Sequence, residues 1–230
     1  VAFWRKMVEE TDGTLIAPGY GTFAHNDAPP LGYPAEWGMR RFECFLVESK
    51  DVGETWHLRA MIAGDRQTGQ EGFDEPVLAD LGGGELLVVM RTGRASPLFQ
   101  SRSLDHGHTW SKPESLHTPG LNPDLILLHD GTLALSSGVR TPDAPWDTRN
   151  IDDYQRRYVE GEDDPPLLQG GYLRFSRDKG HTWSEPLWLD NAVGQCYTAL
   201  VEPEPGRLLF AIRHNWRRYT PGDWQMGEGC

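Results

Sequence analysis

Two stretches of equal length end in residues that could carry out acid–base and nucleophilic chemistry. One runs from Glu75 to Arg91 and the other from Tyr197 to Arg213, and each is seventeen residues long with its turn glycine at the same offset. A tyrosine hydroxyl, with a pKa near 10, is a poor nucleophile until a neighbouring carboxylate takes its proton. An arginine fork binds a carboxylate through two parallel hydrogen bonds. If these four residues meet, the chemistry favours a site for an anionic ligand.

The elements that would bring them together are antiparallel hairpins. Apolar runs flank short turns that contain Gly and Asp, the residues typical of tight hairpin turns. The first and last residues of a hairpin meet at the end opposite its turn. We therefore expect Glu75, Arg91, Tyr197 and Arg213 to lie at one mouth of a repeated structure. Four such hairpins are predicted, over residues 6–17, 76–90, 125–136 and 198–212.

A motif of the form S-x-D-x-G-x-T-W occurs three times, at residues 49–56, 103–110 and 176–183. Its Asp can cap the turn by accepting backbone N–H groups, its Gly supplies a positive φ, and its Trp gives a large apolar anchor. A strand-like run precedes and follows each copy. The recurrence predicts repeated antiparallel sheet units, and we interpret the motif itself as structural.

The motif is the Asp-box signature, and the chain resembles the sialidase-like (BNR-repeat) β-propellers of the neuraminidase superfamily along nearly its whole length. The resemblance implies an all-β fold of four-stranded antiparallel blades, with the box between the third and fourth strands. Residues 1–230 are then one partial propeller domain of about three and a half blades out of a probable six, which we expect to be a fragment of a longer protein. A self-associating half-propeller is the alternative. The expected ranges are blade A 5–63, blade B 73–117, blade C 121–190 and half blade D 196–216.

Composition limits the partners. The net charge of −12 over 230 residues disfavours a nucleic acid or an anionic membrane. Cys44, Cys196 and Cys230 do not suggest a disulfide framework, and no His/Cys group has metal-ligand spacing. No apolar run is long enough to cross a bilayer. We expect an acidic glycan and the remaining blades as partners, and no cofactor or metal; the family resemblance favours a secreted or periplasmic location.

Two long polar loops are expected to overhang the predicted mouth. Residues 22–38 contain His25, Asn26 and Asp27, and residues 141–170 are rich in Asp, Arg and Pro. Long loops of compact domains are often functional.

The resemblance also assigns roles. Residues 74–91 look like the family's "N-E … L-L-x-x-R" stretch, and residues 196–200 resemble its "G-Y-S-x-L" stretch. This implies Tyr197 as nucleophile, Glu75 as its base and Asp27 as acid/base. The residues implied for substrate binding are Arg5, Arg91, Arg140, Arg213 and His25. The family's R-I-P stretch is missing after Arg5, and Arg140 falls two positions past the register set by Arg91, where Gly138 stands.

Three functions stay open. The first is an exo-acting glycoside hydrolase of the sialidase type that releases a terminal acidic sugar with retention, through an adduct on Tyr197. The second is a polysaccharide lyase for uronate-containing glycans, in which Tyr197, His25 and Arg91 would remove the proton beside the carboxylate. The third is a carbohydrate-binding propeller without catalysis. Fold alone does not decide among them.

Overall fold

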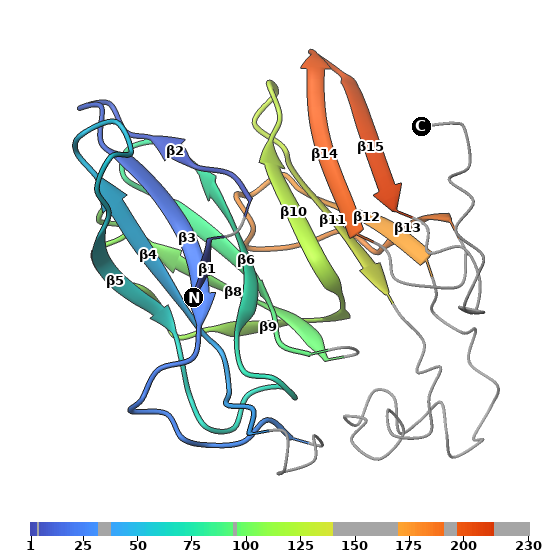
Figure 1. The fold of residues 1–230 in the computed structure, drawn as a ribbon. Coiled ribbons are helices and arrows are strands. Elements are labelled where there is room, and N and C mark those ends of the chain that lie inside the picture. The colour runs from blue at the N-terminus through green and yellow to red at the C-terminus, as the bar shows by residue number, and fades with distance from the viewer. Residues whose placement is uncertain (4, 32–37, 94–95, 140–169, 191–196, 214–230) are drawn as a thin grey trace, which may run out of the picture.

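The computed structural model describes residues 1–3, 5–31, 38–93, 96–139, 170–190 and 197–213. These residues form strands joined by turns and loops, in four separate sheets (Figure 1). None of them forms a helix long and apolar enough to cross a membrane. The all-β fold class predicted from the repeats is confirmed.

Three of the sheets are complete blades and the fourth is a hairpin. Blade A has the order β1-β3-β4-β5. Its first strand is divided into two short strands, because both β1 and β2 pair with β3. Blades B and C have the simple order of four consecutive antiparallel strands, and blade D consists of β14 and β15. The strands are β1 Ala2–Phe3, β2 Val8–Glu9, β3 Leu15–Gly21, β4 Glu43–Ser49 and β5 His57–Ala63; β6 Asp74–Asp80, β7 Leu86–Arg91, β8 Pro97–Ser103 and β9 Glu114–Pro119; β10 Leu121–Leu127, β11 Leu133–Val139, β12 Gly170–Ser176 and β13 Leu187–Asp190; β14 Tyr197–Glu204 and β15 Arg207–Arg213.

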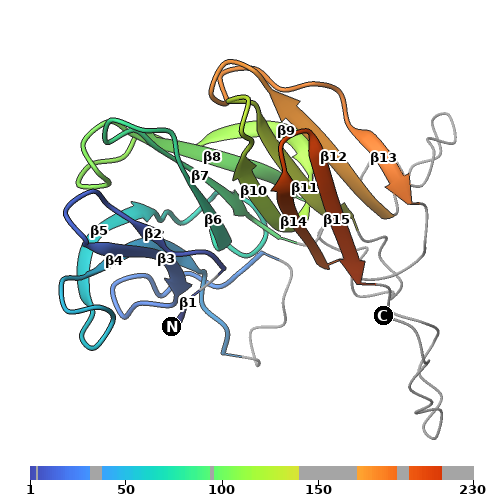
Figure 2. The same cartoon turned by 90° about the horizontal axis from the view of Figure 1, so that it is seen from above.

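The blades follow one another along an arc, with the first strands of the blades on its inner side (Figure 2). The inner strand β10 packs against both β6 and β14. Apolar side chains fill the spaces between neighbouring blades, so the middle strands are buried on both faces. Leu46 of blade A and Val88 of blade B belong to one buried apolar cluster, and Leu87 of blade B and Leu133 of blade C belong to another. Burial of these side chains supplies the main driving force for the fold.

The three Asp boxes build the same turn. The backbone N–H of the Thr lies 2.8 Å from the Asp Oδ1 in each copy, and the Ser hydroxyl accepts the Gly N–H at 2.7–2.8 Å. Hydrogen bonds from the Thr side chain and backbone lower the pKa of Asp51 and of Asp105 to about 2. The predicted turn chemistry is therefore present in each copy, at the end of the blades where the first hairpin turns also lie.

The opposite end of the blades is the predicted mouth. Strands β11 and β15 run down toward it in Figure 1, while the turns that precede them point up. Strand β3 ends at this level, and the loop that contains residues 22–31 leaves from it. The hairpin geometry thus places the ends of β3, β7, β11 and β15 on one side of the molecule.

Candidate active site

The inner strands of the first three blades are irregular at the same level. Arg5, Glu75 and Asn122 have positive φ angles of 61°, 42° and 50°. In blade B the ladder shifts register by one residue between Asp74 and Val77, and in blade C it shifts in the same way between Leu121 and Asp124. Left-handed backbone is uncommon and strained for residues other than Gly, and it clusters at functional sites. Three such residues in successive blades mark this level of the mouth as a candidate site.

These three residues are joined directly. The backbone N–H of Asn122 donates to Glu75 Oε2 at 2.8 Å. Arg5 Nη2 donates to the Asn122 carbonyl at 3.1 Å and also to Asn122 Oδ1. Glu75 and Asn122 are buried, with exposed fractions of 4% and 1%. Residues from blades A, B and C therefore converge on one point of the axis.

A buried carboxylate next to this point ties three blades together. Asp124 of blade C lies 3.1 Å from Lys6 Nζ and 3.6 Å from Arg5 Nη1, both of blade A. It also accepts the backbone N–H of Leu200 in blade D at 2.7 Å. Because a buried carboxylate needs charge and hydrogen-bond partners, Asp124 holds the inner strands in register around the axis.

Arg91 lies among three carboxyl groups. Its guanidinium is 2.8 Å from Glu71, 3.1 Å from Glu75 and 3.7 Å from Asp74. Asp74 is the residue paired with Arg91 in the ladder between β6 and β7. Glu75 lies in the register shift that follows and has no partner residue in that ladder. Burial raises the pKa of Asp74 well above its ordinary value, with Arg91 opposing and with Glu71 and Glu75 adding to the rise. The surroundings of Asp74 therefore favour the protonated form of its carboxyl group.

Tyr197 opens β14 opposite Arg213, at the same level of the mouth. Its side chain is 38% exposed, so a ligand can reach the phenol. Tyr197 lies within electrostatic range of Arg5. Burial lowers the pKa of the Arg5 guanidinium, and the charges of Asp124, Glu75 and Tyr197 oppose that shift. Tyr197 and Glu75 thus both lie within electrostatic range of Arg5, and the role of the phenol as nucleophile stays a prediction.

Tyr20 is a second phenol at the mouth, which the sequence reasoning did not single out. It is half-buried near the end of β3, with its ring edge-on to Phe42 at 5.4 Å. Burial raises the pKa of Tyr20 to about 12, and Glu75 and Asp74 add to the rise. Tyr20 stands five residues after Leu15, as Arg91 stands five after Leu86, so comparing the hairpins in register could have found it.

In the loop after β3, His25 contacts a residue of blade A, and Asp27 contacts the segment that follows β5. His25 Nε2 is 3.0 Å from Glu43 Oε2, and the buried Asn26 donates to Glu43 Oε1 at 2.7 Å. Asp27 is 73% exposed in its side chain and pairs with Arg66 at 2.8 Å. Their roles as acid/base and substrate contact remain predictions.

The remaining predicted arginines are only partly covered by the structure. The backbone of Arg213 pairs with Tyr197, while its side chain is not described. Arg140 and the loop that follows it lie outside the described residues. Within the described ranges, no group of three or more His, Cys, Asp or Glu side chains is arranged to hold a metal ion.

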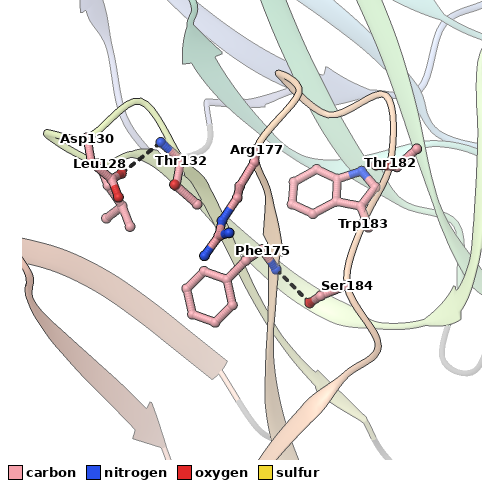
Figure 3. A pocket seen from close by; sticks show the side chains of 8 residues that line it. All are labelled: Leu128, Asp130, Thr132, Phe175, Arg177, Thr182, Trp183 and Ser184. Atoms are coloured by element: carbon pink, nitrogen blue, oxygen red, sulfur yellow. Dashed lines mark hydrogen bonds between the residues drawn. The ribbon is translucent and has the colours of Figure 1, made fainter.

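A large groove lies at the Asp-box end, away from this cluster. It encloses about 670 Å³ beside the third Asp box (Figure 3). A smaller groove lies at the matching place in blade A. Its Asp12, Thr14 and Lys50 correspond to Asp130, Thr132 and Arg177 of the larger groove. The smaller groove is also lined by His106, which belongs to the Asp box of the next blade. We therefore interpret the larger groove as a packing surface between blades. Its lining residues are Leu128, Asp130, Thr132, Phe175, Arg177, Thr182, Trp183 and Ser184.

Comparison with known proteins supports the fold. The model of the BNR repeat-like domain matches residues 4–157. A search of curated proteins found no match.

Solved structures match over most of the chain. A protein of unknown function from Dyadobacter fermentans is 19% identical with a TM-score of 0.66, over 91% of this chain and 48% of its own. Trypanosoma rangeli sialidase in complex with sialic acid is 15% identical with a TM-score of 0.51, over 91% and 33%. A xylan β-1,4-xylosidase from Bacillus halodurans is 12% identical with a TM-score of 0.51, over 88% and 35%. This chain thus spans half or less of the length of each, and likeness at this identity shows the shared fold alone.

Proposed function

The chain belongs to the BNR repeat-like domain family, and we propose that it contributes the active site of a sialidase-type glycoside hydrolase that releases a terminal acidic sugar. The observation that carries this proposal is the meeting of Arg5 and Glu75, from different blades, at Asn122, within electrostatic range of the exposed Tyr197 phenol. The fold neighbours that include a sialidase and a xylosidase support a hydrolase of glycosides.

The reaction would proceed in two steps with retention. Glu75 takes the Tyr197 proton as the phenol oxygen bonds to the anomeric carbon, and the leaving-group oxygen departs with a proton from Asp27. Water, deprotonated by Asp27, then attacks the same carbon and the phenol oxygen recovers its proton from Glu75. A neutral tyrosine approaches an anionic sugar without the repulsion that a carboxylate nucleophile would meet.

We assign the substrate carboxylate first to Arg5, which lies within electrostatic range of Tyr197. Arg5, Lys6 and Arg91 are already paired with the carboxyl groups of Asp124, Glu71 and Glu75. An anionic substrate therefore needs positive charge from elsewhere. We assign that part to Arg213, opposite Tyr197, and to Arg140.

Tyr197→Phe tests the proposal. Turnover of an aryl glycoside of an acidic sugar should fall by about 10³-fold or more, because the nucleophilic oxygen is gone, while binding of the free sugar persists. Tyr172→Phe is the matched control, since it removes a buried phenol that donates to the Pro119 carbonyl at 2.9 Å. Unchanged turnover in Tyr197→Phe rules out the tyrosine adduct.

A lyase is the second candidate, and the pairing of His25 with buried Glu43 favours it. A carboxylate that orients a histidine is a common general-base arrangement. The products separate the two reactions, because elimination leaves an unsaturated sugar that absorbs in the near ultraviolet and hydrolysis does not. Binding of acidic glycans without either product would indicate a non-catalytic propeller.

A further inference from the structure

Asn122 contacts both Arg5 and Glu75 through hydrogen bonds. Its backbone N–H reaches Glu75 Oε2 at 2.8 Å, and its carbonyl and Oδ1 accept from Arg5 Nη2. Its carbonyl also lies 3.3 Å from the Thr198 hydroxyl, in the residue that follows Tyr197. Residues of three other blades are thus oriented by a single asparagine.

The left-handed backbone of Asn122 makes this set of contacts possible. With φ at 50°, in the bulge between Leu121 and Asp124, its N–H is turned out of the hairpin ladder toward blade B. Asn tolerates this conformation better than most residues, and β-branched residues tolerate it least. The strained backbone of Asn122 therefore occurs at the position where it directs an N–H donor toward Glu75.

We propose that Asn122 is a positioning residue that holds Glu75 and Arg5 in a fixed relation to each other, a role that rests on the function proposed above. The backbone N–H holds the carboxylate that deprotonates Tyr197, and Oδ1 holds the guanidinium that receives the substrate carboxylate. The two contacts use different parts of the residue, so different substitutions separate them.

Asn122→Gly removes only the side chain. Glycine accepts the same φ, so the N–H to Glu75 persists while Arg5 loses the Oδ1 acceptor. KM for the acidic aryl glycoside should rise about tenfold or more, the factor expected for one hydrogen bond to a charged group, with kcat within about threefold.

Asn122→Val should break both contacts. A β-branched residue cannot hold the left-handed backbone cheaply, so the N–H leaves Glu75 and kcat falls about a further tenfold or more. His117→Gly and His117→Val are the matched controls, because His117 has a φ of 51° and is exposed on the outer strand β9. The controls should change thermal stability in the same direction and leave both kinetic constants unchanged.

Nuclear magnetic resonance of the ¹⁵N-labelled 230-residue chain tests the positioning without turnover. The Asn122 amide proton should lie downfield because of the carboxylate, and Glu75→Gln should move it upfield. The Arg5 Nη2 protons, which the Asn122 oxygens accept, should exchange slowly and lose part of that protection in Asn122→Gly but not in His117→Gly.

The outcomes are distinct. Turnover that is indifferent to both Asn122 variants, or resonances that do not respond, overturns the positioning role. Resonances that respond in a chain with no turnover of any acidic glycoside retain the positioning and reject the proposed function instead.

Discussion

The two ends of the blades use polar groups in opposite ways. At the Asp-box end, the Asp of each box is satisfied within its own turn, and the pattern is the same in all three copies. At the mouth, Glu75, Asn122 and Asp124 find their partners in other blades, and no two blades offer the same set. Local, repeated contacts stabilise each blade, whereas the non-repeated contacts across the axis create a site. The repeat therefore identifies the fold, and the departures from it identify the candidate chemistry.

The largest effect is expected from Glu75→Gln at the mouth. The amide keeps the size of the side chain and can still accept from the Asn122 N–H, but it cannot take a proton from Tyr197. Turnover should fall by about 10²–10⁴-fold, and the unfolding midpoint should fall less than in Asp124→Ala, because Arg91 keeps Glu71 as a counter-charge. Kinetics and urea denaturation of the same preparation measure both; activity near wild type would remove Glu75 from the mechanism.

Asp124→Ala should be the most damaging change to stability. It leaves Arg5 and Lys6 without their buried counter-charge, and removal of one partner of a buried ion pair costs about 3–5 kcal/mol. The free energy of unfolding from urea titration checks this value. The double variant Arg5→Leu with Asp124→Ala should recover part of the loss, and a cycle with no coupling would show that the pair does not hold the axis.

The Asp boxes should govern acid stability. Since the pKa of Asp105 is about 2 in the folded chain against 3.8 ordinarily, the unfolded chain takes up the proton first as the pH falls. The stabilisation is complete above about pH 4 and is lost between pH 4 and 2. Asp105→Asn should lower the free energy of unfolding at neutral pH and reduce the loss of that free energy between pH 4 and 2.

Additivity provides the control for the box prediction. Asp51→Asn together with Asp105→Asn should produce about the sum of the two single effects, because the two turns share no hydrogen bond among the described residues. If neither change affects the loss of stability between pH 4 and 2, the groups responsible for that loss lie at the mouth instead.

The smallest effect is expected from Val52→Asn. Val52 is 88% exposed and has a φ of 58°, close to the values of His106 and Lys179 at the same position of the other two boxes. This left-handed backbone is strained for a β-branched side chain. Asparagine should raise stability by about 1 kcal/mol, seen as a rise in Tm of about 2–4 °C. A loss of stability would show that strain at the box end is also retained for a reason.

The fold was predictable because the boxes and hairpins are local signals that occur several times. Register reasoning also placed Arg91 beside Glu75, and these side chains do form an ion pair. It did not identify Asn122, Asp124 or Tyr20, because their importance arises from bulges and contacts between blades, which leave no fixed spacing in the sequence. The raised pKa of Asp74 likewise follows from its burial and its acidic neighbours. The split of the first inner strand into β1 and β2, which turns Arg5 toward blade C, was also not anticipated.

The most direct test of the account is to trap the covalent intermediate. A fluorinated acidic-sugar analogue that forms the adduct quickly and releases it slowly should add one sugar mass to the peptide that contains Tyr197, as read by mass spectrometry after proteolysis. We predict a single adduct on that residue, formed more slowly in Glu75→Gln. Turnover of the substrate with no adduct, or an adduct on a carboxylate, would contradict the central claim that the phenol at the mouth is the nucleophile.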